Sequence, residues 1–250
     1  MKIALLKTGR NSRIEHNVFD YFWADGQTKA INLKASNQPS LPRDCYSRLA
    51  FPQCYTAKTK NITFRNNIVR NIFSVLAIGQ FGGNNGGAGE TGPIMMTNNL
   101  WLIDRDKWNS FYSGQNDYYI LYSGAEAWTF SHNTLFDSTT SSLANGVVQI
   151  GSSSPPRSDT VFSSNIFHRG QYGIFASGQA EGNGAAKVFW CGNQNCPPSQ
   201  FGYNLMIGPS VGAILHQRVG LLLTTRSDFR MPEGAISLSI TFKAATAEAG

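Results

Sequence analysis

Residues 127–136 read AWTFSHNTLF and residues 159–167 read DTVFSSNIF, and this pattern recurs along the chain. Further copies are SRIEHNVF at 12–19, NITFRNNIV at 61–69 and PIMMTNNLW at 93–101. All five align on one position, which we call the anchor asparagine: Asn17, Asn67, Asn99, Asn133 and Asn165. Consecutive anchors are 50, 32, 34 and 32 residues apart. A spacing of this kind is typical of a chain built from repeated structural units.

Apolar residues stand at fixed offsets from the anchor asparagine. The residues three positions before it are Ile14, Phe64, Met96, Phe130 and Phe162, and those two positions after it are Phe19, Val69, Trp101, Leu135 and Phe167. A second short apolar segment follows in each unit, at 30–33, 75–79, 118–122, 147–151 and 172–176. No unit has apolar residues at the three- and four-residue intervals of a helix. Each unit is therefore predicted to be strand, turn, strand and loop.

A single unit of this kind cannot bury its apolar face. If every strand pairs in parallel with its copies about 4.8 Å above and below, the stack satisfies its hydrogen bonds and buries a continuous core. The sequence thus predicts an all-β parallel β-helix, a solenoid of about six coils. We expect its coils and loop insertions to occupy residues 1–208 and a C-terminal tail, residues 209–250, to pack on or follow the last coil.

The anchor asparagines are interpreted as structural. Asparagine tolerates the left-handed backbone conformation that a sharp turn requires, and stacked copies can form a ladder of side-chain amides. His16 and His132 directly precede their anchors, where Asn66, Asn98 and Ser164 stand in the other units. We interpret these residues as a structural polar row.

The composition fits a turn-rich β protein. Charged residues make up 14% and hydrophobic residues 41% of the 250 residues, which excludes disorder of the whole chain. Lys and Arg exceed Asp and Glu by 21 to 15, but the sequence has no basic run or nucleic-acid-binding signature. It also has no apolar stretch near the roughly 20 residues of a membrane span, and its opening residues lack an export signal. We expect neither nucleic acid nor a membrane as a partner.

The four cysteines fall into two local pairs, Cys45 with Cys54 and Cys191 with Cys196. Neither pair has the spacing of a zinc or redox site. Two local disulfides would indicate an oxidising compartment. Four reduced thiols are the alternative.

The anchored repeat, with shorter loops on one side than on the other, resembles the right-handed parallel β-helix proteins of the pectin-lyase-like superfold. The segments WADGQ at 23–27 and DFR at 228–230 are similar to sequences of uncharacterised bacterial members. The resemblance implies a right-handed coil and a C-terminal match, so that N-terminal coils are expected to be missing. It also implies an extracellular or cell-surface protein that acts on acidic polysaccharides by lyase, hydrolase or epimerase chemistry.

The catalytic motifs of this superfold are incomplete here. Asn-Thr-Asp, Asp-Asp, Gly-His-Gly and Arg-Ile-Lys, which the hydrolases carry, do not occur, and Arg230-Met231-Pro232 lacks the second arginine of the pectate lyase motif. The first hypothesis is therefore a carbohydrate-active, lyase-like protein whose partner is an acidic polysaccharide. The alternative is a non-catalytic polysaccharide-binding or structural protein of the cell surface.

Residues just past the anchored strands are expected to share one edge of the stack. The predicted catalytic set on this edge is Asp20, Arg70, Asp104, Asp137 and His168. Carboxylates there could act as acid and base or bind calcium, with Asp104 and Asp106 as the ligands. The predicted substrate-binding residues are Trp108, Tyr118, Tyr119, Arg105 and Arg169, with Trp108 and one of the two tyrosines the most exposed. A solvated loop edge without a function is the alternative.

Overall fold

The computed structural model describes residues 4–6, 9–21, 28–35, 58–80, 91–112, 117–139, 144–151, 158–191, 194–197 and 199–207. Within these ranges the chain forms three parallel sheets of six strands each. The predicted C-terminal tail and the Cys45 and Cys54 pair lie outside the described residues.

Each sheet takes one strand from every coil. The first sheet contains β1 (Ala4–Leu6), β4 (Lys29–Ala35), β7 (Ser74–Gln80), β10 (Tyr118–Ser123), β13 (Gly146–Ile150) and β16 (Ile174–Ala176). The second contains β2 (Gly9–Glu15), β5 (Thr59–Arg65), β8 (Ile94–Thr97), β11 (Trp128–Ser131), β14 (Val161–Ser163) and β17 (Phe201–Gly202). The third contains β3 (Val18–Asp20), β6 (Ile68–Ile72), β9 (Leu100–Ile103), β12 (Thr134–Asp137), β15 (Ile166–His168) and β18 (Leu205–Ile207).

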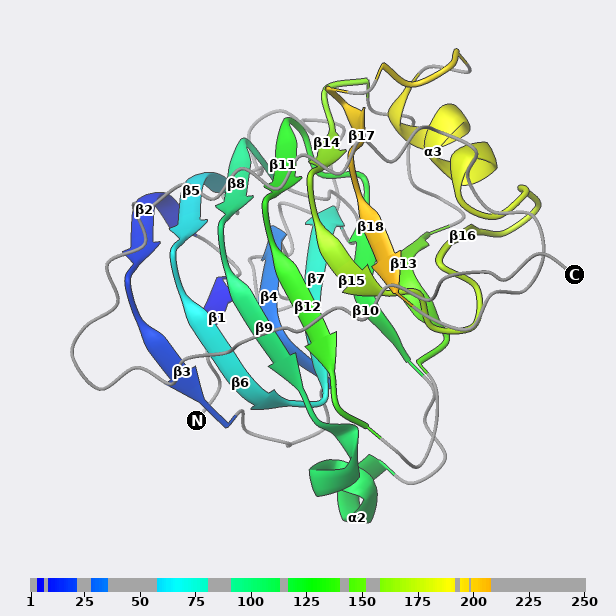
Figure 1. Ribbon diagram of the computed structural model, residues 1–250. Coiled ribbons are helices and arrows are strands. Elements are labelled where there is room, and N and C mark those ends of the chain that lie inside the picture. The colour runs from blue at the N-terminus through cyan, green and yellow to red at the C-terminus, as the bar shows by residue number, and fades with distance from the viewer. Residues whose placement is uncertain are drawn as a thin grey trace, which may run out of the picture. The chain divides into compact units, whose positions relative to one another are not determined.

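Three strands make one coil, and the described strands form six coils (Figure 1). In the view of Figure 1 the chain runs down the front sheet and up the rear sheet while it advances from left to right, which is a right-handed coil. Among the described residues, short helices interrupt two coils: η2 (Arg105–Trp108) and α2 (Asn109–Tyr112) follow β9, and α3 (Asn183–Trp190) follows β16. The predicted all-β parallel β-helix is confirmed.

The core contains the two apolar rows that flank the anchors and a third row from the first sheet: Ile31, Leu76, Ile120, Val148 and Ile174. Strand register places Ile14, Phe64, Met96, Phe130, Phe162 and Phe201 next to one another. Phe130 and Phe162 are fully buried, and their rings stack at 5.4 Å with an interplanar angle of 9°. The other row is Phe19, Val69, Trp101, Leu135, Phe167 and Met206. Both rows confirm the apolar offsets read from the sequence.

The anchor asparagines form one hydrogen-bonded ladder. The backbone N–H and Nδ2 of Asn99 both donate to Oδ1 of Asn133, at 3.1 and 2.9 Å. Nδ2 of Asn133 also donates to the Met96 carbonyl at 2.9 Å, so that this side chain is bonded to the coil before it. The complete ladder is Asn17, Asn67, Asn99, Asn133, Asn165 and Asn204. Its last member obeys the same rule as the others, with Phe201 three positions before and Met206 two after.

The left-handed residue of each turn is not the anchor, contrary to the sequence interpretation. Positive φ angles near 55° belong to the residues directly before the anchors: His16, Asn66, Asn98, His132, Ser164 and Tyr203. Asparagine is required at the next position, the anchor, because its side-chain amide both accepts and donates hydrogen bonds. Buried polar groups need such partners. A hydroxyl or carboxylate cannot supply both a fixed acceptor and two donors.

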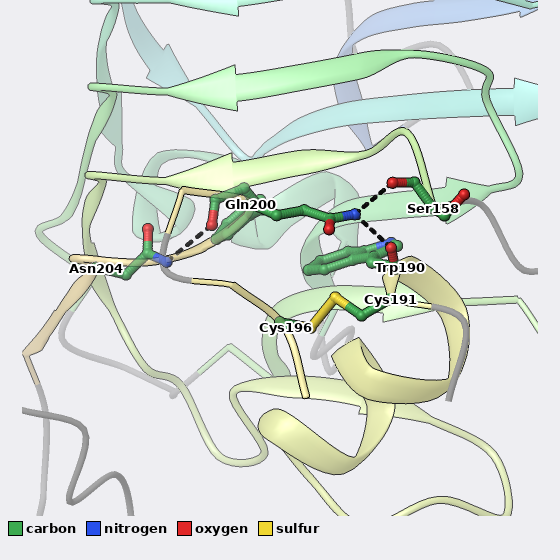
Figure 2. Close-up of a disulfide and its surroundings, with 7 residues drawn as sticks. Ser158, Trp190, Cys191, Cys196, Gln200 and Asn204 are labelled. Carbon is green, nitrogen blue, oxygen red and sulfur yellow. Dashed lines mark hydrogen bonds between the residues drawn. A yellow bond between two sulfur atoms is a disulfide. The ribbon is translucent and has the colours of Figure 1, made fainter. Parts of the chain in front are cut away.

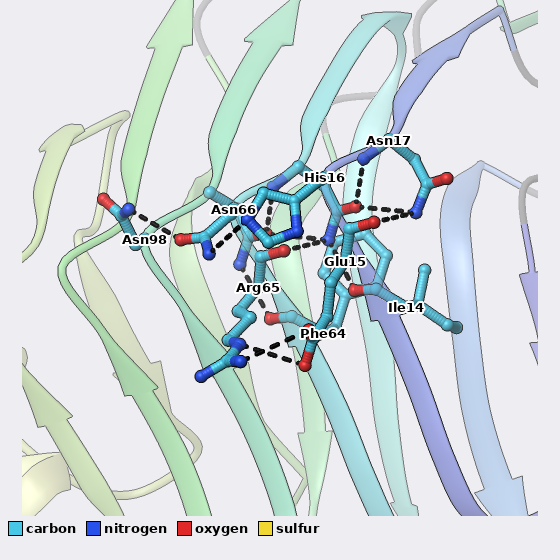
Figure 3. A network of polar contacts seen from close by, with 10 residues as sticks. Ile14, Glu15, His16, Asn17, Phe64, Arg65, Asn66 and Asn98 are labelled. Atoms are coloured by element: carbon cyan, nitrogen blue, oxygen red, sulfur yellow. Dashed lines mark hydrogen bonds and ion pairs between the residues drawn. The ribbon is translucent and has the colours of Figure 1, made fainter. Parts of the chain in front are cut away.

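The residues before the anchors form an outer polar row, as predicted. Figure 3 shows the side chains of His16, Asn66 and Asn98 side by side on three consecutive coils. Nδ2 of Asn98 donates to Oδ1 of Asn66 at 2.8 Å, and Nδ2 of Asn66 lies 3.1 Å from Nε2 of His16. These amides are solvent-exposed, so they contribute less than the buried ladder beneath them.

A disulfide joins Cys191 to Cys196 at the end of α3 (Figure 2). The adjacent Trp190 is fully buried, and its ring stacks on Phe162 at 5.5 Å. Nε2 of Gln200 donates to the carbonyls of Ser158 and Trp190. The disulfide therefore closes a short loop that is held against the core, and the local pairing predicted for these two cysteines is confirmed.

Replacing Phe130 by alanine should lower the free energy of unfolding by about 3–5 kcal/mol, because it removes a fully buried ring from the middle of the stack. Urea unfolding followed by circular dichroism measures the change. Phe111, whose ring is 65% exposed, is the matched control, and Phe111→Ala should change stability by no more than about 0.5 kcal/mol. Equal effects of the two substitutions would show that the inward face has been misassigned.

Candidate functional site

The predicted catalytic residues do not lie in one row. Strand register aligns the residues three positions after the anchors, and these are Asp20, Arg70, Leu102, Phe136, His168 and Ile207. Apolar side chains therefore stand where the sequence interpretation placed Asp104 and Asp137. The reason is that the predicted residues stand at different offsets from their anchors: Asp137 is four and Asp104 five positions after, not three. Asp137 therefore lies opposite Ile103, and Asp104 follows the end of β9.

A polar network does join three coils at the end of β3, β6 and β9. Asp20 accepts from Nε and Nη2 of Arg70 at 2.9 and 2.7 Å, and from Nδ2 of Asn71. The Oδ1 of Asn71 accepts from Lys107, whose Nζ lies 3.2 Å from Oδ2 of Asp104. The structure therefore brings together Asp20, Arg70 and Asp104 of the predicted set, linked through Asn71 and Lys107.

Hydrogen bonding lowers the pKa of Asp20. The largest cause is the Asn71 amide, and the Arg70 guanidinium and the Lys107 ammonium add to it, while partial burial opposes them. Since the pKa of Asp20 is depressed in the folded state, its carboxylate stabilises the fold at pH values above the ordinary pKa of 3.8. That contribution is lost as the pH falls through the lowered value.

Three aromatic rings lie beside this network. Trp108 packs edge-on against Tyr21 and is tilted against Phe111, each at a centroid distance of 6.2 Å. Tyr21 is 49% and Phe111 65% exposed, whereas Trp108 is only 8% exposed and donates from Nε1 to the Asn71 carbonyl. Lys107 Nζ lies 5.9 Å from the centroid of the Tyr21 ring. The prediction that Trp108 is exposed is wrong, because its neighbours Tyr21 and Phe111 occupy the outer positions.

We call this group the corner cluster: Asp20, Tyr21, Arg70, Asn71, Asp104, Lys107, Trp108 and Phe111. Sequence reasoning missed four of its members. Tyr21 and Asn71 share the position four after their anchors and both have positive φ angles, so the repeat alignment could have found them. Lys107 and Phe111 belong to η2 and α2, an insertion that the repeat does not predict.

Asp137 belongs to a separate, buried group. Its side chain is 6% exposed and lies 3.5 Å from Nη2 of Arg105, which is 2% exposed. The Tyr119 hydroxyl donates to Asp137 Oδ2 at 2.7 Å, and the Thr139 N–H donates to Oδ1 at 2.9 Å. Burial, followed by the Asp137 carboxylate, raises the pKa of Tyr119 far above its usual range. These contacts hold the segment that begins η2 against the coil.

The other predicted substrate-binding residues are also enclosed. Tyr118 is 6% exposed, and burial, followed by Tyr172, Glu181 and Asp117, raises its pKa to about 12. Neither Tyr118 nor Tyr119 is therefore the exposed ring that was expected. Arg169 pairs with Glu181 at 2.8 Å, with its own side chain 11% exposed.

His168 is packed against an aromatic ring, with its imidazole edge-on to Phe136 at 5.4 Å. Within the described ranges, no three His, Cys, Asp or Glu side chains group closely enough to hold a metal ion. Calcium binding by Asp104 and Asp106 remains a prediction. In the part of the chain that the structure describes, no helix has both the length and the apolar character needed to span a membrane.

A second surface gathers positive charge that is dispersed in the sequence. Parallel pairing of β2 with β5 sets Arg10 beside Lys60, Arg13 beside Thr63, and Glu15 beside Arg65. We call Arg10, Arg13, Lys60 and Arg65 the cationic face. The cationic face could have been found from the sequence, because Arg10 and Lys60 both stand seven positions before their anchors, Asn17 and Asn67.

Comparison of the chain with protein-family models, with curated proteins and with solved structures found no match.

Replacing Asn71 by glycine should raise the pKa of Asp20 toward its ordinary value of 3.8, because the amide hydrogen bond that lowers it is lost. Glycine keeps the positive φ of 54° at this position without strain. A carboxyl-detected NMR titration measures the pKa of Asp20. The comparison variant Arg70→Met should also raise the pKa, because it removes the hydrogen bonds and the positive charge of the guanidinium, and an unchanged pKa in Asn71→Gly would contradict the network described above.

Proposed function

We propose that the protein is a polysaccharide-binding β-helix protein of the extracellular space or cell surface, a member of the pectin-lyase-like superfold. The single observation that supports this best is the pair of exposed rings in the corner cluster, Tyr21 and Phe111. Both rings pack against the buried Trp108. An aromatic side chain offers a large, rigid apolar face at small entropic cost, which suits the apolar face of a sugar ring.

The polar half of the corner cluster supports recognition of hydroxyl groups. Asp20 pairs with Arg70 and Asp104 pairs with Lys107, so that positive and negative charges offset one another in this group. The side chains of Arg70 and Lys107 are 44% and 45% exposed and retain N–H donors toward solvent. Paired charged groups of this kind donate and accept hydrogen bonds without favouring an ionic ligand. We therefore propose that the corner cluster binds uncharged sugar units.

The rigidity of the cluster also favours binding. Asn71 connects the two ion pairs, and the Trp108 indole is hydrogen-bonded to the Asn71 carbonyl. A site whose side chains are already held in place loses less entropy when a ligand binds. The extracellular location is supported by the Cys191–Cys196 disulfide, since such bonds persist in oxidising compartments.

Lyase-like action on an acidic polysaccharide remains the catalytic alternative. It requires an arginine or histidine near the uronate carbon that loses its proton. Arg70 in this structure is engaged by Asp20, and His168 is packed on Phe136. Binding without catalysis is accordingly the function that the corner cluster supports better.

Tyr21→Ala combined with Phe111→Ala should weaken binding to a neutral polysaccharide by at least about tenfold, because both stacking surfaces are removed. Affinity electrophoresis through gels containing β-glucan, xylan or galactan measures the binding. Both rings are on the surface, so the melting temperature should stay nearly unchanged.

The matched control is Tyr203→Ala, which removes a 65% exposed tyrosine outside the corner cluster. It should bind as the unmodified protein does. Absence of retardation for the unmodified protein on all three polysaccharides would refute the proposal. Release of unsaturated sugar product from polygalacturonate, lost in Asp104→Ala, would favour the catalytic alternative instead.

A further inference from the structure

The first coil has three open strand edges. Within the described residues, β1 pairs only with β4, β2 only with β5 and β3 only with β6, so each of them stands at the end of its sheet. Figure 1 shows β2 and β3 at one end of the stack and α3, beside β17, at the other. An open strand edge presents N–H and C=O groups to which another strand can bind. The first coil is therefore a candidate interface with another chain.

The repeat shows which peptide groups point out of this end. Carbonyls two positions before the anchors accept from the preceding coil, and N–H groups one position after the anchors donate to it, as Arg65 and Ile68 do. Glu15 and Val18 hold these positions in the first coil. Alternate residues of a strand direct their peptide groups to the same side, so Arg13 points the same way as Glu15. All three therefore offer peptide groups at the open end.

The ladder and the apolar rows also end openly here. Oδ1 of Asn67 accepts from the preceding anchor, whereas Oδ1 of Asn17 has no donor among the described residues. Ile14 and Phe19, the first members of the two rows, are only partly buried. In the last coil Phe201 is 4% exposed, and Trp190 of α3 packs beside it at 5.8 Å. Of the described elements, α3 packs on the last coil, and none packs on the outer side of the first.

The outward charges of β2 suit a second copy of the same strand. Arg13 is exposed and has no acidic partner among the described residues. Glu15 is held by Arg65, whose Nε lies 3.0 Å from Oε1, in the ion pair drawn in Figure 3. If two copies of β2 pair in antiparallel around Ile14, Arg13 of each copy lies opposite Glu15 of the partner subunit. Opposite charges at facing positions stabilise paired strands.

The same charges select one register. A shift that moves the pairing by one residue toward Arg13 sets it opposite Arg13 of the partner subunit, and a shift the other way sets Glu15 opposite Glu15 of the partner subunit. Like charges that face each other are destabilising. Charges at an edge usually prevent pairing. Here they prevent every pairing except the one centred on Ile14.

We propose that the open edge of the first coil binds the same edge of a second copy of this chain, giving a two-fold dimer through antiparallel β2 strands. Ile14 then meets Ile14 of the partner subunit, and the apolar row continues across the interface. A head-to-tail contact would instead bring the first coil onto the last coil, where Trp190 of α3 packs. A two-fold contact uses only the open end, and two-fold dimers are the commonest oligomers. The proposal is independent of sugar binding by the corner cluster.

The size of the edge indicates how strong the dimer is. β1, β2 and β3 contribute 3, 7 and 3 residues. A standard interface has about 20–30 residues on each side. We therefore expect a reversible dimer with a dissociation constant on the order of micromolar.

Sedimentation velocity at protein concentrations from about 1 to about 200 µM tests the proposal. The unmodified protein should change from monomer to dimer and form no larger species. Arg13→Glu and Glu15→Arg should each weaken dimerisation by at least about tenfold, because each places like charges opposite one another at two sites. An equimolar mixture of the two variants should dimerise again, since opposite charges then face each other at both sites.

Lys187→Glu makes the same charge change as Arg13→Glu on an exposed residue of α3, so it is the matched control and should dimerise as the unmodified protein does. Circular dichroism shows whether each variant is folded. If Glu15→Arg does not fold, the comparison of Arg13→Glu with Lys187→Glu decides.

Four results would overturn the proposal. These are a monomer at every concentration, assembly that continues beyond the dimer, equal weakening by Lys187→Glu and Arg13→Glu, or a mixture of the two folded variants that stays monomeric. Equal weakening would indicate a response to net charge alone, and continued assembly would indicate head-to-tail stacking of the coils.

Discussion

The ladder of anchor asparagines is the constraint on which the rest of this structure depends. Each buried amide accepts the backbone N–H and the Nδ2 of the preceding anchor, and its own Nδ2 returns to that earlier coil. A shift of one residue in any coil would leave these groups buried and unsatisfied, which is costly. The ladder therefore sets the register in which Phe130 meets Phe162, and it specifies one stacking of the coils.

The same register decides which surface residues become neighbours. Residues at equal offsets from successive anchors lie side by side, as Arg10 and Lys60 do seven positions before theirs. Asp20 meets Arg70 for the same reason, three positions after. The Asp20–Arg70 pair of the corner cluster and the Arg10–Lys60 pair of the cationic face thus join residues that are 50 apart in the chain. The chemistry of these surfaces depends on side chains that point outward and do not pack in the core.

The sequence was sufficient to predict the coil and the inward rows because these features repeat. It also contained the sixth anchor, Asn204, although the α3 insertion obscured the spacing. The predicted catalytic row was wrong because it grouped residues at three, four and five positions after their anchors, whereas only residues at equal offsets become neighbours. The burial of Trp108 depends on an insertion that the repeat pattern does not contain. Features that occur once cannot be predicted from a repeat.

The unfolding free energy of Asn133→Ala tests the role of the ladder most directly. The substitution leaves the Asn99 N–H and the Met96 carbonyl without their buried partner, so we expect a loss of at least about 3 kcal/mol. Asn98→Gly removes an exposed amide from the outer row and keeps the left-handed turn, so it should cost less than about 1 kcal/mol. A large loss for Asn133→Ala with a small one for Asn98→Gly is the result that the account predicts. Equal losses, or a loss below about 1 kcal/mol for Asn133→Ala, would contradict it.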